Sequence, residues 1–195
     1  MKSELDYEIA NQSGSSLEEL HKELQELKDQ INKEKKSNEV NIICFSGEWD
    51  RLFAALTIAN GSLAMNMEVH LFFTFWSVNA IRKHVKPPPE GKSFIQKMFL
   101  RMMPGGINRA PLSKLNCFGL SKLFLKQEMK KQRIDDIDQL FEEVKELGAH
   151  IHVCDTSSAL FGLDCRELNT GDKADICGVT TFLSHAFKGK MVLFI

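Results

Sequence analysis

Short apolar runs alternate with helical segments through most of this chain, and this alternation constrains the fold more than any other feature. Residues 40–45 and 67–75 are rich in β-branched and aromatic side chains, and residues 48–65 between them repeat apolar side chains at helical spacing. A strand, a helix and a second strand in this order indicate a βαβ unit with parallel strands. Because the pattern recurs towards the C-terminus, we expect an α/β fold with an open, mainly parallel sheet of about five strands and helices on both faces.

The C-terminal elements are shorter but follow the same alternation. A helix is expected at 135–147, where Gly148 ends it, and a short helix after Asp155 stops at Gly162. The remaining expected elements are strands at 149–154, 174–179 and 190–195 and a helix at 180–187.

The N-terminal segment differs in composition from the rest of the chain. Residues 1–16 are polar and are expected to be disordered. Apolar side chains then recur at alternating spacings of three and four residues, which predicts a short coiled-coil-like helix through Leu17, Leu20, Leu24, Leu27 and Ile31. After a charged linker, the domain begins. We therefore divide the chain into a tail, helix and linker at 1–37 and an α/β domain at 38–195.

Charge is strongly segregated, although the net charge is only −1. Residues 82–133 hold 13 Lys and Arg against 2 Asp and Glu, and their helical stretches at 94–103 and 112–129 place Met and Phe beside the basic residues. Such an excursion suits contact with a partner protein or a membrane surface, through Lys97, Arg101, Arg109 and Lys114. The alternative is that it packs on its own domain and its charges face acidic neighbours.

Several classes of protein are disfavoured by composition and motifs. The longest uncharged apolar run, 69–81, is too short to span a bilayer, and the N-terminus carries no secretory signal pattern. Five cysteines in a chain of this length indicate reduced thiols, so we expect a cytoplasmic protein, with contact to the membrane periphery as an alternative. GxxxxGK[ST], GxGxxG, GxSxG and CxxC motifs are missing from the sequence, so neither a cofactor nor a metal is expected. Nucleic-acid binding is not expected either, because Tyr occurs once and the aromatic residues of the basic segment are Phe on helix faces.

Cys154 is the leading candidate for chemistry. It ends the strand predicted at 149–154, and open parallel sheets place their reactive groups at that end of the strands. Thr156, Ser157 and Ser158 follow and can start a helix whose free backbone N–H groups would stabilise a thiolate. Asp155 would oppose this if its carboxylate lies close. The alternative is that Cys154 is a small buried apolar side chain.

Histidines and the other cysteines offer weaker candidates. His150, His152 and Cys154 alternate on one strand face, but the outer two lie about 13 Å apart at ~3.3 Å per residue, so the three cannot bind one metal ion. His152 is therefore either a proton partner for Cys154 or a packed core histidine. Cys44 and Cys177 are expected to be buried. Cys117 and Cys165 are expected in more polar surroundings, where Cys165 could serve as a resolving thiol.

Three segments together resemble a known family. They are residues 45–83, which contain FFTFW; residues 99–131, in which MMP precedes LSK and an Asn; and residues 137–163, which contain the strand-end cysteine and a helix ending in Phe-Gly. In this combination they resemble the DsrE/DsrF-like superfamily, in the branch often labelled peroxiredoxin-like or DsrE-like sulfurtransferase. The resemblance runs from about Val40 to the C-terminus. Ser77 stands where relatives often have Gly, and a peroxidatic Thr-x-x-Cys motif is missing.

The resemblance implies a homo-oligomeric α/β protein of a sulfur relay. The family's strand-end cysteine, which carries sulfane sulfur as a persulfide, corresponds to Cys154, and its Ser-rich turn corresponds to Thr156–Ser158. A TusA-like or rhodanese-like protein would then be the sulfur donor or acceptor. The first hypothesis is thus a sulfur carrier or sulfurtransferase acting through Cys154. The second is a non-catalytic oligomeric scaffold or membrane-surface adaptor that uses the basic excursion.

Overall fold

The structure is a computed structural model that describes residues 21–26, 28, 37–83, 91–103, 105–114, 120–170 and 174–195. Met1–Ser37 and Asn38–Ile195 form two separate compact units. In the first unit, residues 21–26 and 28 are helical, which is part of the segment predicted as a helix. The disorder expected at 1–16 and most of the apolar seam lie outside the described residues.

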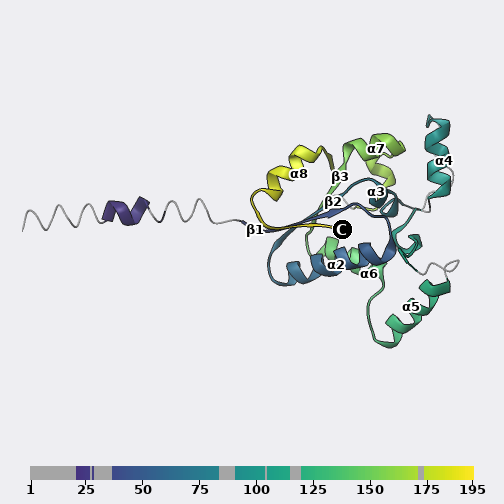
Figure 1. Ribbon diagram of the computed structural model, residues 1–195, viewed down its shortest axis with the longest axis horizontal. Coiled ribbons are helices and arrows are strands. Elements are labelled where there is room, and N and C mark those ends of the chain that lie inside the picture. The colour runs from purple at the N-terminus through teal and green to yellow at the C-terminus, as the bar shows by residue number, and fades with distance from the viewer. Residues whose placement is uncertain are drawn as a thin grey trace, which may run out of the picture. The chain divides into compact units, whose positions relative to one another are not determined.

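A five-stranded sheet forms the centre of the larger unit (Figure 1). Its order is β4-β3-β2-β1-β5, and β1 to β4 pair in parallel. The Ile195 N–H donates to the Ile43 carbonyl at 2.9 Å and the Ile195 carbonyl accepts from Phe45 at 2.8 Å, which is the parallel pattern for β5 as well. The predicted α/β class with an open parallel sheet is confirmed. The strands are β1 (Ser37–Cys44), β2 (Glu68–Phe73), β3 (His150–Cys154), β4 (Ala174–Cys177) and β5 (Gly189–Phe194).

Helices lie on both faces of this sheet. In Figure 1, α2 and α6 lie on one face, and α7 and α8 lie on the other. Among the described residues, the connections also contain the 3₁₀ turns η1 (Ile107–Arg109) and η2 (Cys165–Glu167). The helices of the larger unit are α2 (Trp49–Ala64), α3 (Trp76–Ala80), α4 (Phe94–Met102), α5 (Leu120–Lys131), α6 (Ile137–Glu146), α7 (Asp155–Phe161) and α8 (Val179–Ala186).

The two faces of the sheet differ in chemistry. The face towards α2 and α6 is apolar, and its strand residues are almost completely buried: Val40, Ile42, Cys44, Val69, Leu71, Phe73, Ile151 and Val153. The face towards α8 has a small apolar cluster at the carboxyl ends of the strands, built from Phe72, Cys154, Cys177, Phe182 and Ala186. Behind this cluster the same face is polar, with buried Asn41, His70 and His152. Burying polar side chains costs free energy unless they find partners, and His70 and His152 partly meet this need by a hydrogen bond to each other.

The element boundaries depart from the predicted ones where turns and pairing override the apolar pattern. β1 begins at Ser37 because backbone pairing extends beyond the apolar run, with Glu39 opposite Glu68. β2 ends at Phe73 rather than at residue 75, because Phe75 adopts a φ of 52° and the unpredicted helix α3 follows. In the stretch predicted as helical at 112–129, residues 112–114 are loop and α5 is described from Leu120.

Candidate functional site

Cys154 lies at the carboxyl edge of the sheet, where the ends of the parallel strands meet. It is the last residue of β3 and also the N-cap residue of α7. Its neighbours at this edge are Thr74, directly after β2, and Cys177, its partner in register on β4. The side chain is buried, with 7% of its surface exposed. The predicted strand-end position of this thiol is therefore what the structure shows.

Hydrogen bonds decide the ionisation of this thiol. Burial by itself would raise the pKa of the Cys154 thiol, because a thiolate loses solvation inside the protein. The hydroxyl groups of Ser157 and Thr74 and the backbone N–H groups of Ser157 and Thr156 donate to the sulfur, and together they lower its pKa below the ordinary value. Thiolate is the nucleophilic form of cysteine, so this environment favours attack by sulfur.

The loop after β2 fixes these donors in place. The Phe75 N–H donates to the Ser157 hydroxyl oxygen at 2.9 Å, and the Thr74 and Ser157 hydroxyl oxygens lie 3.2 Å apart. Phe75 reaches this position with a φ of 52°, a left-handed conformation that is strained for a non-glycine residue. Ser77 braces the turn, because its hydroxyl lies 2.5 Å from the Cys44 carbonyl and accepts from the Thr74 N–H at 3.0 Å. The turn therefore links the ends of β1 and β2 to the start of α7.

The other described thiols are in opposite electrostatic surroundings. Burial raises the pKa of Cys44 to about 12. Burial and then the negative charges of Asp175, Asp155 and the Cys154 thiolate raise the pKa of Cys177 to about 11. Cys44, Cys154 and Cys177 are all free thiols. Among the cysteines whose side chains the structure describes, only Cys154 has a lowered pKa.

His152 is engaged away from Cys154. Its Nδ1 lies 2.7 Å from the Asp175 carboxylate, and its Nε2 lies 3.0 Å from His70 Nδ1. Both ring nitrogens therefore have partners other than Cys154. His152 is thus a packed histidine, which was the alternative to a proton partner for Cys154. Burial, followed by the neighbouring imidazoles of His185, His150 and His152, lowers the pKa of His70 to about 3.

The remaining predicted site residues differ in exposure, because Asp155 is exposed and Ser158 is buried. The exposed Asp155 carboxylate accepts from the Thr156 N–H at 2.5 Å and from the Thr156 hydroxyl at 3.0 Å. Ser158 is buried, but its hydroxyl has no partner among the described residues. Cys117 and the Cys165 side chain lie outside the described residues, so the resolving role considered for Cys165 stays a prediction.

Sequence reasoning did not identify Thr74, Phe75 and Cys177 as part of this environment. Thr74 and Phe75 belong to FFTFW, one of the motifs that only in combination indicate the family, and their contact with α7 depends on a turn geometry that spacing does not reveal. Cys177 lies in the strand predicted at 174–179, which the structure shows as β4. Its register opposite Cys154 depends on the order of strands in the sheet, which is a tertiary property.

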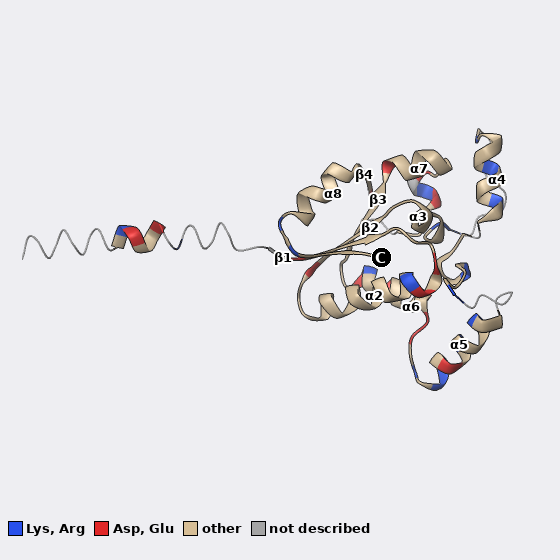
Figure 2. Ribbon diagram, viewed as in Figure 1, with Lys and Arg blue, Asp and Glu red and all other residues tan. Residues whose placement is uncertain are grey.

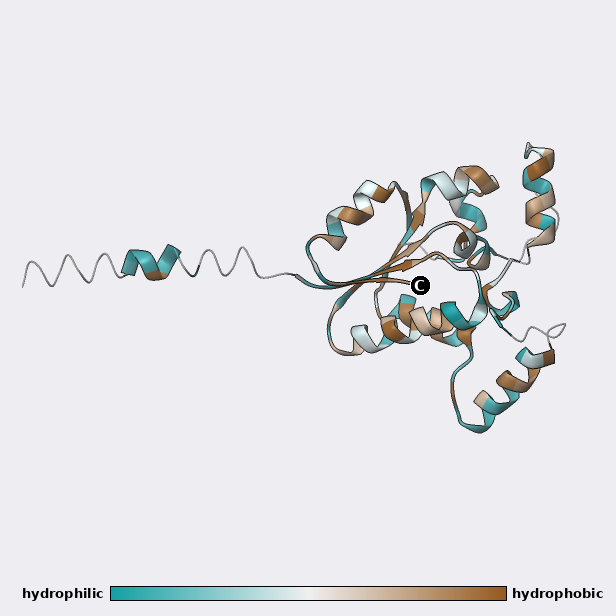
Figure 3. Cartoon of the chain, viewed as in Figure 1, coloured by the Kyte–Doolittle hydropathy of each residue, from teal (hydrophilic) through white to brown (hydrophobic). Residues whose placement is uncertain are grey.

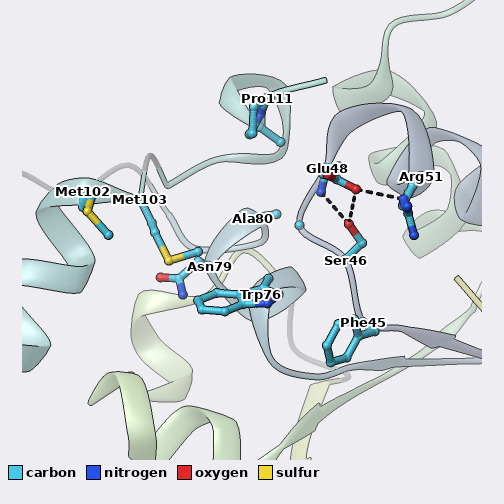
Figure 4. A pocket seen from close by; sticks show the side chains of 12 residues that line it. Phe45, Ser46, Glu48, Arg51, Trp76, Asn79, Ala80, Met102, Met103 and Pro111 are labelled. Atoms are coloured by element: carbon cyan, nitrogen blue, oxygen red, sulfur yellow. Dashed lines mark hydrogen bonds and ion pairs between the residues drawn. The ribbon is translucent and has the colours of Figure 1, made fainter. Parts of the chain in front are cut away.

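A cleft of about 470 Å³ lies at the same edge of the sheet, beyond α3 (Figure 4). Phe45 and Ser46 line it from the loop after β1, Trp76 and Asn79 from α3, and Met103 from the end of α4. The Asn79 carboxamide is buried and has no hydrogen-bond partner among the described residues. Cys154 is not one of the lining residues, so the cleft and the thiol are neighbours on one edge rather than one cavity.

The basic excursion is partly neutralised within its own domain. The Lys126 ammonium lies 2.7 Å from the Asp136 carboxylate, and Lys92 lies 2.7 Å from Glu167. Lys97 and Arg101 on α4, Arg109 in η1 and Lys114 are exposed, and Figure 2 shows basic residues along α4. Beside these basic residues, α4 exposes the apolar side chains of Phe94, Ile95, Met98 and Met102. Figure 3 shows hydrophobic residues on both α4 and α5. Within the described ranges, no helix combines the length and the apolar character needed to cross a bilayer.

An open parallel sheet that holds a hydrogen-bonded, lowered-pKa cysteine at its carboxyl edge defines a thiol-bearing α/β protein. The model of the DsrE/DsrF/DrsH-like family matches residues 36–194, and the chain belongs to this family. The expected family is thereby confirmed.

This chain aligns with two curated relatives over nearly the whole length of each relative. The uncharacterized protein YrkE of Bacillus subtilis is 40% identical over 154 residues, which is 79% of this chain and 94% of YrkE. The sulfur carrier protein DsrE2 of Allochromatium vinosum is 24% identical over 160 residues, which is 79% of this chain and 96% of DsrE2. Among solved structures, the ychN protein from E. coli is similar at 16% identity with a TM-score of 0.49, over 80% of this chain and 98% of ychN.

Proposed function

We propose that this protein is a sulfur carrier that binds sulfane sulfur as a persulfide on Cys154 and transfers it to an acceptor thiol. The observation that carries the proposal is the set of hydroxyl and backbone donors that lowers the pKa of Cys154 against the effect of burial. Membership of the DsrE/DsrF/DrsH-like family and the similarity to a protein described as a sulfur carrier support it.

Both half-reactions use the same property of the sulfur. In the first, the Cys154 thiolate attacks the outer sulfur of a donor persulfide, the S–S bond of the donor breaks, and the donor leaves as a thiolate. In the second, an acceptor thiolate attacks the outer sulfur of the Cys154 persulfide, and Cys154 leaves as a thiolate. The donors that favour the thiolate make Cys154 reactive in the first step and a good leaving group in the second.

Each half-reaction requires another protein or a small thiol. A TusA-like or a rhodanese-like protein fits this chemistry, as the sulfur donor or as the acceptor. The second candidate function, an oligomeric scaffold or membrane-surface adaptor, is favoured by one observation, which is that α4 exposes apolar side chains as well as Lys97 and Arg101. The exposed apolar residues of this helix are Phe94, Ile95, Met98 and Met102. The two functions differ in whether Cys154 is required.

Persulfide loading tests the proposal directly. The reduced protein is incubated with inorganic polysulfide and its intact mass is measured, and we expect one added sulfur atom that peptide mapping places on Cys154. The loaded protein should then transfer this sulfur to glutathione. Cys154→Ser should lose both loading and transfer, because the hydroxyl group cannot form the persulfide.

Cys177→Ser and Cys44→Ser are matched controls, since both remove a buried thiol whose pKa is raised rather than lowered. Both variants should retain most of the loading. Loading that survives in Cys154→Ser and maps to Cys117 or Cys165 would contradict the assignment, and so would a wild-type protein that gains no sulfur.

A further inference from the structure

Three buried polar side chains lie together on the sheet face under α8 and leave several of their polar atoms without hydrogen bonds. Glu39 and Asn41 of β1 and His70 of β2 share this face, and Asn41 stands directly opposite His70 in the register. Glu39 Oε2, His70 Nε2 and both polar atoms of the Asn41 carboxamide have no hydrogen-bond partner among the described residues. The His70 side chain is 2% exposed and that of Glu39 is 11% exposed. Native proteins rarely leave buried polar atoms unpaired, so this concentration indicates a missing partner.

Hydrogen bonds on the other side of His70 determine what kind of partner is missing. An ionised carboxylate only accepts hydrogen bonds, so His152 Nδ1, 2.7 Å from Asp175, carries a hydrogen. In the neutral ring His152 Nε2 then accepts from His70 Nδ1–H across 3.0 Å. His70 Nε2 is left with a lone pair. It faces carboxylate oxygens of Glu68 at 3.4 Å and Glu39 at 3.8 Å, and neither can donate to it.

A nitrogen lone pair that faces carboxylate oxygens is stabilised by a cation placed between them. His185, in the last turn of α8, adds a second imidazole, whose ring centroid lies 4.3 Å from that of His70. One ligand atom each from Glu39, His70 and His185 lie within 4.8 Å of one another. The two rings are stacked with 29° between their planes, and ligand atoms of one tetrahedral ion are separated by about 3.3 Å. Binding of one ion by both imidazoles therefore requires the half-buried His185 side chain to rotate.

We propose that Glu39, His70 and His185 bind a divalent transition-metal ion of the zinc type. Two imidazoles and a carboxylate are a donor set that zinc prefers, whereas magnesium and calcium prefer oxygen ligands alone. The hydrogen-bonded series from His70 through His152 to Asp175 is the supporting arrangement that orients metal-bound histidines in proteins. The ligands come from β1, β2 and α8, so the site cannot be identified from a local sequence motif.

Zinc binding to the reduced, untagged chain tests this site. Isothermal titration with ZnCl₂ should give one ion per chain, and the melting temperature should rise with zinc, because a ligand that binds the folded state stabilises it. MgCl₂ should produce neither effect. Glu39→Gln and His185→Gln should each weaken zinc binding by at least about tenfold, in keeping with the loss of a ligand. His185 lies half-buried at the end of a helix, so its variant is expected to keep its fold, as far-UV circular dichroism would verify.

A second group on the same face provides the competing site. His152, Asp175 and Cys177 also bring ligand atoms within 4.8 Å of one another. Cys177→Ser should leave zinc affinity unchanged if the proposed ligands are right, and the Co²⁺-loaded protein should lack a sulfur-to-cobalt charge-transfer band. Loss of binding in Cys177→Ser, or the appearance of that band, overturns the proposal in favour of the competing site. A wild-type chain that shows neither stoichiometric binding nor a rise in melting temperature overturns it as well, with water as the partner of the unpaired atoms.

Discussion

Ser157 connects three groups at the start of α7. Its oxygen accepts the Phe75 N–H, its hydroxyl lies next to that of Thr74, and its own hydrogen is thereby available to the Cys154 sulfur. The backbone N–H of the same residue also donates to the sulfur. The strained turn at Phe75 and the ionisation of Cys154 are therefore coupled through one side chain.

Removal of this hydroxyl should weaken the nucleophile. In Ser157→Ala we expect the pKa of Cys154 to rise, because a charge-assisted hydrogen bond to the thiolate is lost while burial still opposes ionisation. Iodoacetamide labelling of Cys154 at neutral pH should slow by about three- to tenfold, and its pH profile should move to higher pH.

The adjacent serine gives a matched control for this effect. Ser158 is as buried as Ser157, but its hydroxyl has no partner among the described residues. Ser158→Ala should therefore leave the labelling profile where it is in the wild type. Equal shifts in both variants would show that general loosening of α7, and not the Ser157 hydroxyl, changes the reactivity.

At the scale of the elements, the sequence predicts strands and helices well and their junctions poorly. The alternation of apolar runs predicts all five strands and the helices α2, α6, α7 and α8, and it is clearest in α2 and α6, which bury apolar side chains at helical spacing. The Phe75 turn and α3 were not predicted, because tertiary hydrogen bonds to Cys44 and Ser157 stabilise a conformation that local propensity disfavours.

The residues of the candidate site also differ in how far the sequence predicts them. Cys154 and its helix donors follow from chain order alone, since a strand end directly precedes a helix start. Thr74 and Cys177 come from neighbouring strands, and the zinc ligands proposed above come from three separate elements. Contacts of this kind depend on strand order and register, which a single sequence does not encode in any local spacing.

Asp136 joins two elements, and its loss should destabilise both. Its carboxylate caps α6 by accepting the Ile137 N–H at 2.8 Å, and it pairs with Lys126 of α5 at 2.7 Å. Asp136→Ala should lower the free energy of unfolding by about 1–2 kcal/mol, the usual cost of losing a helix cap, as measured by urea denaturation. Asp135→Ala removes the same charge from the preceding exposed residue and should change stability by less than about 0.5 kcal/mol.

This destabilisation should depend on pH. Burial would raise the pKa of Asp136, but the hydrogen bond from Lys126, the Ile137 N–H, the Lys126 charge and Asn108 lower it overall. A carboxyl group with a lowered pKa in the folded state contributes its stabilisation fully above its unfolded pKa of about 3.9, and loses it as the pH falls through the folded value. The difference between wild type and Asp136→Ala should therefore persist at neutral pH and shrink below about pH 4. A difference that stays constant through this range would exclude an ionic contribution.

At the scale of the whole α/β unit, α4 and α5 stand out because each exposes several large apolar side chains. On α4 the Phe94 side chain is 82% exposed, and on α5 the Leu123 side chain is 66% exposed. Each helix exposes further large apolar side chains, which are Ile95, Met98 and Met102 on α4 and Leu120, Phe124 and Leu125 on α5. Exposed apolar side chains gathered in this way commonly mark interfaces, and basic residues beside them would give such contacts a dependence on salt.

We expect these helices to mediate self-association, so light scattering at micromolar concentration should give a mass above 22.2 kDa. Phe94→Glu and Leu123→Glu should reduce this mass, because a carboxylate cannot be buried in an apolar interface without a partner. Neither change should alter far-UV circular dichroism, since both side chains project from the domain. Met65→Glu is the matched control, because Met65 is 73% exposed but lies at the end of α2, and it should leave the mass unchanged. A monomeric wild type that instead binds anionic vesicles, with binding lost in Phe94→Glu, would assign the same surface to a membrane.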